Sequence, residues 1–406
     1  MIRFRDTVLL CGLAAIGPFS IDTYVPVLPS MASELGVHAS AVQLTLTSYL
    51  GGLLVGVVVA GVLSDAVGRR GPLLWGLVLY VVASLACAAS PSVEVLIAAR
   101  AVQAFGVAAA TVIARAVVRD VTDGHAVTRV LSQLTLVQGL APTVAPLLGS
   151  QLLHVTSWRG VFVFLAVAGA VLLSVSVIVL PESMRRRRHP RMTARWATMA
   201  GSYRLLGRDR RFLCYATAFA AAFGALFAYV SASPFVLQDL HGLSAVQFSC
   251  VYGVNGFGMI LAGQFNARWV ARLSEVRLLG AGLLACSGGG VASLVTILVD
   301  SPLWILLVAL LVVVASLGLV MPNATSLAMQ DHPDRAGAAF SLLTVVQLAV
   351  SAVASWMAGL GAGHQAEVSM TTTMALFAVL AALTFLCDKT LSYRKRGRQH
   401  DIASLP

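Results

Sequence analysis

Charged residues are scarce in this sequence of 406 residues. Asp, Glu, Lys and Arg together make up 11% of the chain, while 58% of the residues are hydrophobic and the mean hydropathy is +0.86. Soluble domains carry charge on about 25% of their residues. The composition therefore excludes an ordinary soluble protein and indicates a chain that is embedded in a membrane.

Several kinds of functional site are also missing. The six cysteines stand at wide spacing in apolar segments and form no Cys-x-x-Cys pair, so we expect neither a disulfide framework nor a thiolate metal site. No apolar run contains two histidines at i, i+4, which argues against an intramembrane metal or haem site. A GxxxxGK(S/T) phosphate loop is absent, which excludes ATP-driven transport by this chain alone. The polar segments show no catalytic loop, so we expect a chain that is not an enzyme and uses no cofactor or metal.

Long apolar runs take the place of the missing charge. Runs of about 20 apolar residues predict membrane-spanning helices. Twelve such spans are predicted, near 7–28, 43–63, 72–90, 93–117, 127–153, 157–180, 211–237, 245–270, 275–299, 302–329, 336–361 and 367–388. One extended polar segment divides them into two sets of six. We therefore predict an all-α membrane protein with six-helix bundles at 1–183 and 211–390, a basic linker at 184–210 and a tail at 391–406.

The net charge of +11 is distributed unevenly. If the N-terminus is inside, all basic residues except Arg100 and Arg159 fall on the inner side, and Arg115 and Arg119 are counted there. This is the positive-inside rule, and it places both termini in the cytoplasm. The run RRRRHPR at 185–191 is then expected to anchor the linker near anionic lipid rather than to bind nucleic acid. The basic start is interpreted as part of an uncleaved first span, because the apolar run after it is too long for a signal peptide.

Two charged residues lie inside predicted spans and away from the span ends. Asp22 interrupts the first span in IGPFSIDTYVPVLP, and Arg100 lies in the fourth, one helical turn before Gln103. A central Asp or Arg costs about 2.5–3.5 kcal/mol on insertion scales, and such residues usually face a bundle interior or an aqueous cavity. Asp22 could instead be a structural ion pair or a helix cap. Arg100 could serve only in packing, by bonding backbone carbonyls.

Other polar and aromatic residues are weaker candidates for a binding cavity. Interhelical hydrogen bonding explains most polar residues in spans, and ordinary packing explains most single aromatic residues. With these alternatives open, the candidate substrate-binding residues are Phe19, Asp22, Tyr24, Arg100, Gln103, Phe223, Phe227, Asn255, Asn323 and Gln347.

Glycine and proline residues in the fifth span indicate a surface that can bend. In GLAPTVAPLLGS, these residues follow one another at intervals of three or four, so they share one helix face. Small residues on one face let helices approach closely. The predicted hinge residues are Gly139, Pro142, Pro146 and Gly149.

Three segments carry a resemblance to a known family. GVLSDAVGRRGPLL at 61–74 resembles the major facilitator superfamily signature G-x-L-x-D-x-x-G-R-R/K-x-x-L, and its matching residues include Gly61, Asp65, Gly68, Arg69 and Arg70. RAVQAFGVAAA at 100–110 is similar to the span-four motif of that superfamily, with Ala104 in place of a glycine. APTVAPLLGS is similar to the span-five antiporter motif, with Ala145 and Ser150 in place of glycines.

Further segments resemble the Bcr/CflA group of drug-resistance exporters, among them FSIDTYVPVLPSMASEL, FAYVSASPFVLQ, YGVNGFGMI and GLVMPNATSLAM. The resemblance implies two pseudo-symmetric six-helix bundles, the major facilitator fold, and proton-coupled multidrug efflux across a bacterial inner membrane. It also implies that the loop of Asp65 and Arg69 closes the cytoplasmic side as a gate. GQFNARWVARL at 263–273 should match this signature in the second half, but it has no acid at the position of Asp65.

We hypothesise that Asp22 carries the coupling proton, while Arg100 tunes it or binds an anionic group of the substrate. Burial disfavours a charged carboxylate and a nearby arginine favours it, so a cavity that opens and seals could load and unload a proton. The expected partners are protons, a small amphipathic substrate and the lipid bilayer, with no nucleic acid and with a monomeric chain. The alternative is uptake or facilitated transport of a small metabolite on the same fold. A non-transporting sensor would need an appended domain, which we do not see.

Overall fold

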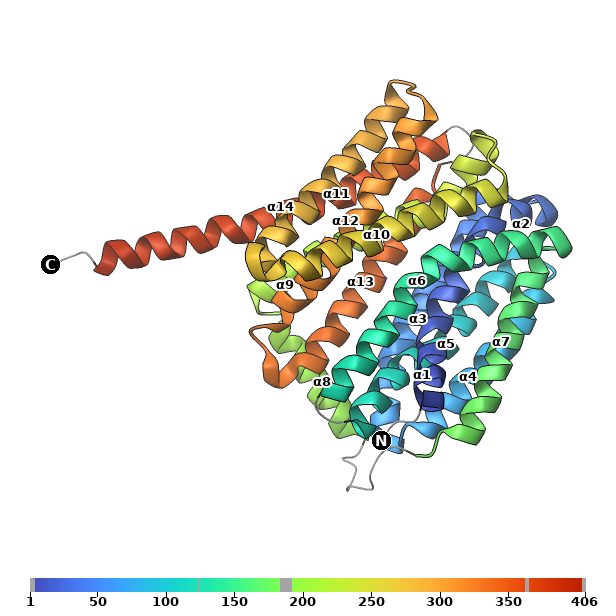
Figure 1. Cartoon of the computed structure of the whole chain (residues 1–406), viewed down its shortest axis with the longest axis horizontal. Helices are drawn as coiled ribbons and strands as arrows, with labels where there is room; N and C mark the ends of the chain where they lie inside the picture. The colour runs from blue at the N-terminus through green and yellow to red at the C-terminus, as the bar shows by residue number, and fades with distance from the viewer. Residues whose placement is uncertain (1–3, 123–124, 183–191, 362–364, 404–406) are drawn as a thin grey trace.

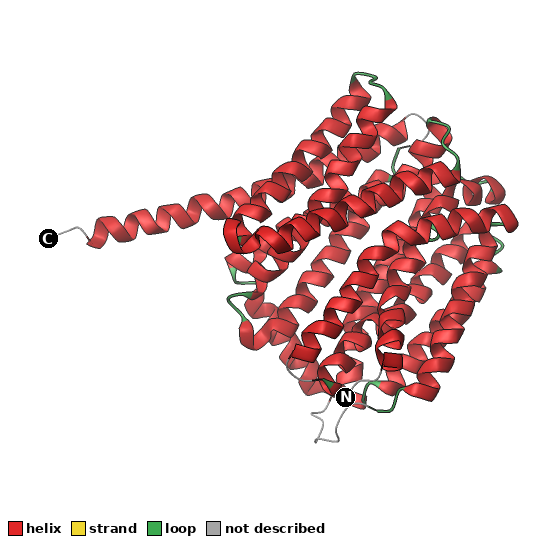
Figure 2. Ribbon diagram, in the orientation of Figure 1, coloured by secondary structure: helices red, strands yellow, loops and turns green. Residues whose placement is uncertain are grey.

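The computed structural model describes residues 4–122, 125–182, 192–361 and 365–403, and within these ranges it contains helices and short connections but no strand (Figure 2). Twelve helical segments in these ranges are long and apolar enough to cross a membrane. The predicted all-α membrane fold is confirmed. Residues 185–191 of the basic linker lie outside the described ranges.

The first group of helices forms one side of the molecule in Figure 1. The first predicted span is longer than expected and is broken, because Pro26 and Pro29 lie at the starts of two short helices, where their missing N–H groups cost no hydrogen bond. The elements of this first group are α1 (Phe4–Asp22), η1 (Val25–Val27), α2 (Leu28–Leu35), α3 (Ala39–Val67), α4 (Arg70–Ala88), α5 (Val93–Val121), α6 (His125–Val155) and α7 (Trp158–Val179).

The second group lies beside the first (Figure 1). It consists of α9 (Arg210–Pro234), η2 (Phe235–Leu240), α10 (Ala245–Leu273), α11 (Glu275–Leu298), α12 (Leu303–Met329), η3 (Pro333–Arg335), α13 (Ala336–Ala358) and α14 (Gln365–Ala403). Between the groups, part of the predicted linker is helical, as α8 (Met192–Leu206). The last helix continues to Ala403 through most of the predicted tail and projects from the body (Figure 1). We call the end of the first group that carries α8 and the chain's N-terminus the linker end.

Close contacts between helix backbones hold each group together. In the first group, a Cβ atom at Gly52 of α3 would lie 2.1 Å from the carbonyl oxygen of Ala101 in α5. In the second group, a Cβ atom at Gly318 of α12 would lie 2.3 Å from the carbonyl oxygen of Met259 in α10. Lipid supplies no hydrophobic force between helices, so van der Waals contact at such small residues is a main source of their association.

The two groups meet along two pairs of helices, α3 with α13 and α6 with α10. The contact of α6 with α10 lies in the halves of these helices away from the linker end. The Ser249 hydroxyl donates to the carbonyl oxygen of Pro146 at 2.9 Å, and a Cβ atom at Gly256 would lie 3.3 Å from Pro142 Cβ. Beside this contact, the Gln238 side-chain amide donates to the carbonyl oxygen of Pro26 at 3.1 Å. Side chains of the second group therefore bond backbone oxygens of the first.

The predicted hinge residues of α6 do not share one environment. Pro142 and Pro146 face α10, whereas a Cβ atom at Gly149 would lie 1.9 Å from the carbonyl oxygen of Thr23. A Cβ atom at Gly139 would meet no atom within 4 Å. Close packing therefore requires Gly149 but not Gly139, and the hinge role of all four residues stays a prediction.

Candidate functional site

Asp22 lies at the junction of the two helix groups. It is the last residue of α1, and the residue is 6% exposed. Its Oδ1 accepts a hydrogen bond of 2.9 Å from the hydroxyl of Tyr252, which belongs to α10 in the second group. Across the described ranges, no lysine, arginine or histidine forms an ion pair with this carboxylate. The geometry thus favours a link between the groups over a structural ion pair.

Two further residues of the second group extend this contact. The ring of Tyr229 in α9 stacks on Tyr252, with centroids 5.7 Å apart and an interplanar angle of 22°. The amide of Asn255 donates to the Tyr229 hydroxyl at 2.9 Å. Asn255 is a predicted site residue, but Tyr252 is not. A sequence signal for it existed, because Tyr252 precedes Asn255 by three residues on the same helix face and a buried tyrosine hydroxyl needs a partner.

Arg100 occupies a separate cluster inside the first group. The residue is fully buried, and its Nη1 donates to Gln103 Oε1 at 2.6 Å and to the carbonyl oxygen of Ser20 at 3.2 Å. The rings of Tyr24 and Tyr49 each lie 4.2 Å from the guanidinium carbon, an arrangement that stabilises a cation away from water. Arg100 makes no ion pair with Asp22. It holds the backbone two residues before Asp22, which corresponds to the packing alternative.

The remaining predicted binding residues are dispersed. Phe223 is buried and contacts Phe219, with ring centroids 4.9 Å apart. Asn323 donates to Asn266 Oδ1 at 2.6 Å, which joins α12 to the last part of α10 rather than to Asp22. Three predicted residues are partly exposed: Phe19, Phe227 and Gln347. The structure therefore joins Asp22 with Asn255 and joins Tyr24, Arg100 and Gln103 in a second place.

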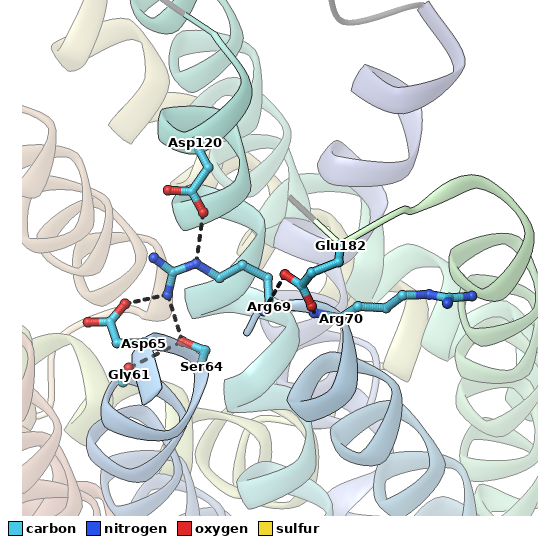
Figure 3. A network of polar contacts seen from close by, with 7 residues as sticks. All are labelled: Gly61, Ser64, Asp65, Arg69, Arg70, Asp120 and Glu182. Atoms are coloured by element: carbon cyan, nitrogen blue, oxygen red, sulfur yellow. Dashed lines mark hydrogen bonds and ion pairs between the residues drawn. The ribbon is translucent and has the colours of Figure 1, made fainter. Parts of the chain in front are cut away.

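The predicted gate residues form a charged network at the linker end (Figure 3). The Arg69 guanidinium pairs with Asp65, and its Nε donates to Asp120 Oδ2 at 2.9 Å; Figure 3 shows the two carboxylates on different sides of it. Burial lowers the pKa of Arg69, but the hydrogen bonds to Asp120 and Asp65 outweigh burial and raise the pKa above its ordinary value. Asp120 lies at the end of α5, and the signature alone does not reveal it.

A second carboxylate contact fixes the start of α4. Glu182, just beyond α7, accepts hydrogen bonds from the backbone N–H groups of Arg69 at 2.9 Å and Arg70 at 3.2 Å. A helix N-terminus favours such an anion. Gly68 has φ +105°, and a Cβ atom there would lie 2.7 Å from Glu182 Oε2. Only glycine suits both the backbone and the carboxylate at this position. The Arg70 side chain points away from Asp65 and Asp120 and bonds the carbonyl oxygen of Val177 (Figure 3).

No group of three or more His, Cys, Asp or Glu residues in the described part of the chain is arranged to hold a metal ion. Gln138 and Arg115, which lie closer to the linker end than Asp22, are bonded to each other at 2.7 Å. Among the described residues, the polar chemistry of the interior is therefore that of the Asp22 carboxylate, Arg100, Arg115 and neutral amides and hydroxyls.

Comparisons with known proteins agree on one family. The family model of the Major Facilitator Superfamily matches residues 10–355. The chain is 34% identical over 385 residues to the uncharacterized MFS-type transporter YdgK of Bacillus subtilis, covering 94% of this chain and 95% of that protein. It is 29% identical over 387 residues to the bicyclomycin resistance protein homolog of Haemophilus influenzae, covering 95% and 96%. The solved D-xylose-proton symporter is similar in fold, with a TM-score of 0.71, 15% identity and coverage of 94% and 96%.

Proposed function

The chain belongs to the Major Facilitator Superfamily, and we propose that it is a proton-coupled exporter of small amphipathic molecules. The resemblance to the drug-resistance exporters of this superfamily is confirmed by relatives such as the bicyclomycin resistance protein homolog. Membership makes the chain a multi-pass membrane transporter. Export, proton coupling and the identity of the cargo belong to the proposal.

The hydrogen bond between Asp22 and Tyr252 is the observation that carries the proposal. Transporters of this fold move by rocking one helix bundle against the other around a central site. Asp22 belongs to one group and its donor to the other. Any motion that separates α1 from α10 therefore changes the surroundings of the carboxylate. A proton carrier needs such a change, because it must bind the proton on one side of the membrane and release it on the other.

The donor gives this change a direction. A hydrogen bond to a carboxylate favours its charged form, and burial without a donor favours the protonated form. While α1 and α10 are joined, Tyr252 stabilises the carboxylate. When the groups separate at this end, Asp22 loses this donor and opens to water, and a proton from that side of the membrane can bind in place of the donor. A cationic cargo can then compete with the proton for Asp22, and this competition couples export to proton entry.

The driving force is sufficient for this task. One proton supplies about 2.3 kcal/mol per 100 mV of membrane potential and about 1.4 kcal/mol per unit of pH difference. Together these support a concentration ratio of roughly a few hundredfold. We further propose that the linker end faces the cytoplasm of a bacterial inner membrane, that the chain acts as a monomer, and that the network of Arg69 closes the cytoplasmic side.

Two experiments test the proposal. Cells that express the chain should become less susceptible to at least one member of a panel of amphipathic antibiotics that includes bicyclomycin. For the compound with the largest effect, proteoliposomes should then transport it against an imposed proton gradient, and Asp22→Asn should abolish this transport in a folded protein. Transport in the same direction as the protons would instead support uptake, and unchanged coupling in Asp22→Asn would assign the proton to another group.

A further inference from the structure

Arg115 lies inside a membrane-spanning helix, although the sequence analysis counted it with the basic residues of the inner side. It stands six residues before the end of α5, which corresponds to about 9 Å along the helix axis. Side chains of a helix lean toward its N-terminus. The Arg115 side chain therefore leans away from the linker end and toward the interior, in the direction opposite to that of a lipid or topology anchor.

The guanidinium of Arg115 lies where four helices converge. Its Nη2 donates to Gln138 Oε1 of α6 at 2.7 Å, and Gln138 Nε2 donates in turn to the carbonyl oxygen of Ala14 in α1 at 2.9 Å. The ring of Phe340, at the start of α13 in the second group, lies 5.5 Å from the guanidinium carbon. Arg115, Gln138 and Phe340 are all partly exposed. The cluster is thus an accessible place on the boundary between the groups.

Arg115 differs from the other arginines that the structure holds in place. Arg69 is paired with two carboxylates, and Arg100 is enclosed between two tyrosine rings without exposed surface. Among the described residues no carboxylate pairs with Arg115. Its Nε and Nη1 bond none of the described residues and the residue is partly exposed, so these donors remain available to a ligand. A half-buried cation without a counter-charge is costly, and a guanidinium offers a planar pair of donors that matches a carboxylate.

We propose that Arg115 and Gln138 bind the acidic group of the transported molecule, so the cargo includes amphipathic acids or zwitterions. Gln138 is held in orientation by Ala14 and can offer its second amide proton to the same anion. Phe340 supplies an aromatic surface for the apolar part of the molecule. Because Phe340 belongs to the second group, rocking of the groups would open and close this site. The proposal depends on the proposed transport function only for the statement that the bound molecule is also moved.

The test uses two probes that differ in one charge, 1-naphthylacetate and its neutral amide, 1-naphthylacetamide. Binding of each probe to the purified full chain in phosphatidylcholine nanodiscs is measured by calorimetry at pH 7. The wild-type protein should bind the acid at least about tenfold more tightly than the amide, as expected for a charge-assisted hydrogen bond. Equal binding of the two probes would overturn the proposal.

Three variants identify the residues responsible. Arg115→Gln should remove the preference for the acid. Gln138→Glu should remove it as well while Arg115 is retained, because a carboxylate at the 2.7 Å contact pairs with the guanidinium internally. Arg119→Gln is the matched control, since it removes one positive charge from an exposed position one helical turn further along α5 and should keep the preference. A preference that survives Arg115→Gln, or that is lost equally in Arg119→Gln, contradicts a specific site. Thermal unfolding of each variant verifies the fold, and Gln138→Glu, which is nearly isosteric, keeps the test valid if Arg115→Gln is unstable.

Two further arms separate this site from its alternatives. If an anionic lipid headgroup were the occupant, nanodiscs that contain phosphatidylglycerol would lose the preference for the acid, and the assignment to cargo would be wrong. Asp22→Asn should abolish proton-driven transport but retain the preference. A retained preference in a wild-type protein that shows no proton-driven export would refute the proposed coupling and leave the anion site in place.

Discussion

The connection between α3 and α4 and the connection between α10 and α11 occupy corresponding places in the two helix groups, but they are held by different interactions. In the first, Arg69 is bound by Asp65 and Asp120, and Glu182 caps the next helix (Figure 3). In the second, two neutral amides, Asn266 and Asn323, bond each other at 2.6 Å, and Glu275 at the start of α11 accepts a hydrogen bond of 3.0 Å from the Ser326 hydroxyl. Arg272 of this segment contacts the ring of Trp269 at 5.4 Å rather than an acid.

The difference shows how two similar helix hairpins come to differ in their sensitivity to salt and to the removal of a charge. The contact of an arginine with two carboxylates depends on all three charges, and it weakens when any one of them is removed. A pair of neutral amides depends on hydrogen-bond geometry and is indifferent to salt. The turn residues differ as well, since Gly68, just after α3, has φ +105° and Ser274, just after α10, has φ +65°. We expect the first connection to act as the gate and the second to act as a passive packing contact.

Removal of the central charge should have the largest effect. Arg69→Gln removes the guanidinium that pairs with both Asp65 and Asp120, at a cost of about 3 kcal/mol, between the values for surface and buried pairs. Thermal unfolding in detergent should show a clear loss of stability, and transport should fall at least about tenfold. Arg272→Gln, in the corresponding connection of the second group, removes a single cation–π contact and should cost about 0.5–1 kcal/mol. Equal losses in both variants would erase the proposed asymmetry.

The turn residues should show the next largest effect. Gly68 has φ +105° and ψ 168°, a region essentially restricted to glycine, so Gly68→Ala should cost about 2 kcal/mol and displace Glu182. Ser274→Gly should act in the opposite direction and stabilise the chain by up to about 1 kcal/mol, since it relieves a positive φ in a non-glycine residue. Unfolding midpoints measured side by side would test this, and a neutral Gly68→Ala would show that the Glu182 contact can relax freely.

The third prediction concerns the amide pair of Asn266 and Asn323, where removal of both polar groups should cost less stability than removal of one. Asn323→Leu leaves Asn266 without its partner and should cost about 1–2 kcal/mol. The double substitution Asn266→Leu, Asn323→Leu removes both polar groups and should recover part of that loss. A double-mutant cycle on the unfolding free energy measures this coupling. Additive losses would mean that the two amides are solvated independently.

The smallest effect concerns pH at the start of the second group. Asp209 Oδ2 lies 2.7 Å from His332 Nε2, and its Oδ1 accepts from the backbone N–H of Arg211. Burial alone would raise the pKa of Asp209, but the hydrogen bonds from His332 and the backbone outweigh it and lower the pKa. The stability that Asp209 contributes is therefore complete above its unfolded pKa of about 3.9 and is lost as pH falls through the lower folded pKa.

Unfolding temperatures at pH 6 and pH 3 measure this contribution. The wild-type protein should lose more stability on acidification than Asp209→Asn does, by a few degrees at most. Asp334→Asn, at an exposed position in the same region, is the control and should follow the wild type. Identical acid sensitivity of Asp209→Asn and the wild type would remove this contact from the comparison.

The fold could be predicted from the sequence because a lipid environment requires long apolar helices, and twelve such runs can be counted. Local pairs were equally accessible, since Asp65 and Arg69 stand only four residues apart in the sequence, across the end of α3. Contacts between distant segments were not. Tyr252, Asp120 and Glu182 reach their partners from helices far away in the sequence, and no periodicity states which faces meet.

Arg115 shows a different limit of the sequence. Hydropathy placed it at the end of a span and the positive-inside rule counted it as a topology signal. The direction of the Arg115 side chain depends on the direction of α5, and its partners Gln138 and Phe340 belong to two other helices. Only the packed arrangement distinguishes a residue that points to the interior from one that extends to the headgroups.

The contacts at Pro26 and Pro146 have a genetic consequence. In both, the second group contributes a side-chain donor, Gln238 or Ser249, and the first group contributes a main-chain oxygen. Every amino acid carries that oxygen, so only a substitution of the donor, in the second group, can remove either hydrogen bond. A saturation library should therefore record intolerance at positions 238 and 249, while any intolerance at 26 and 146 would reflect ring geometry instead of lost bonding.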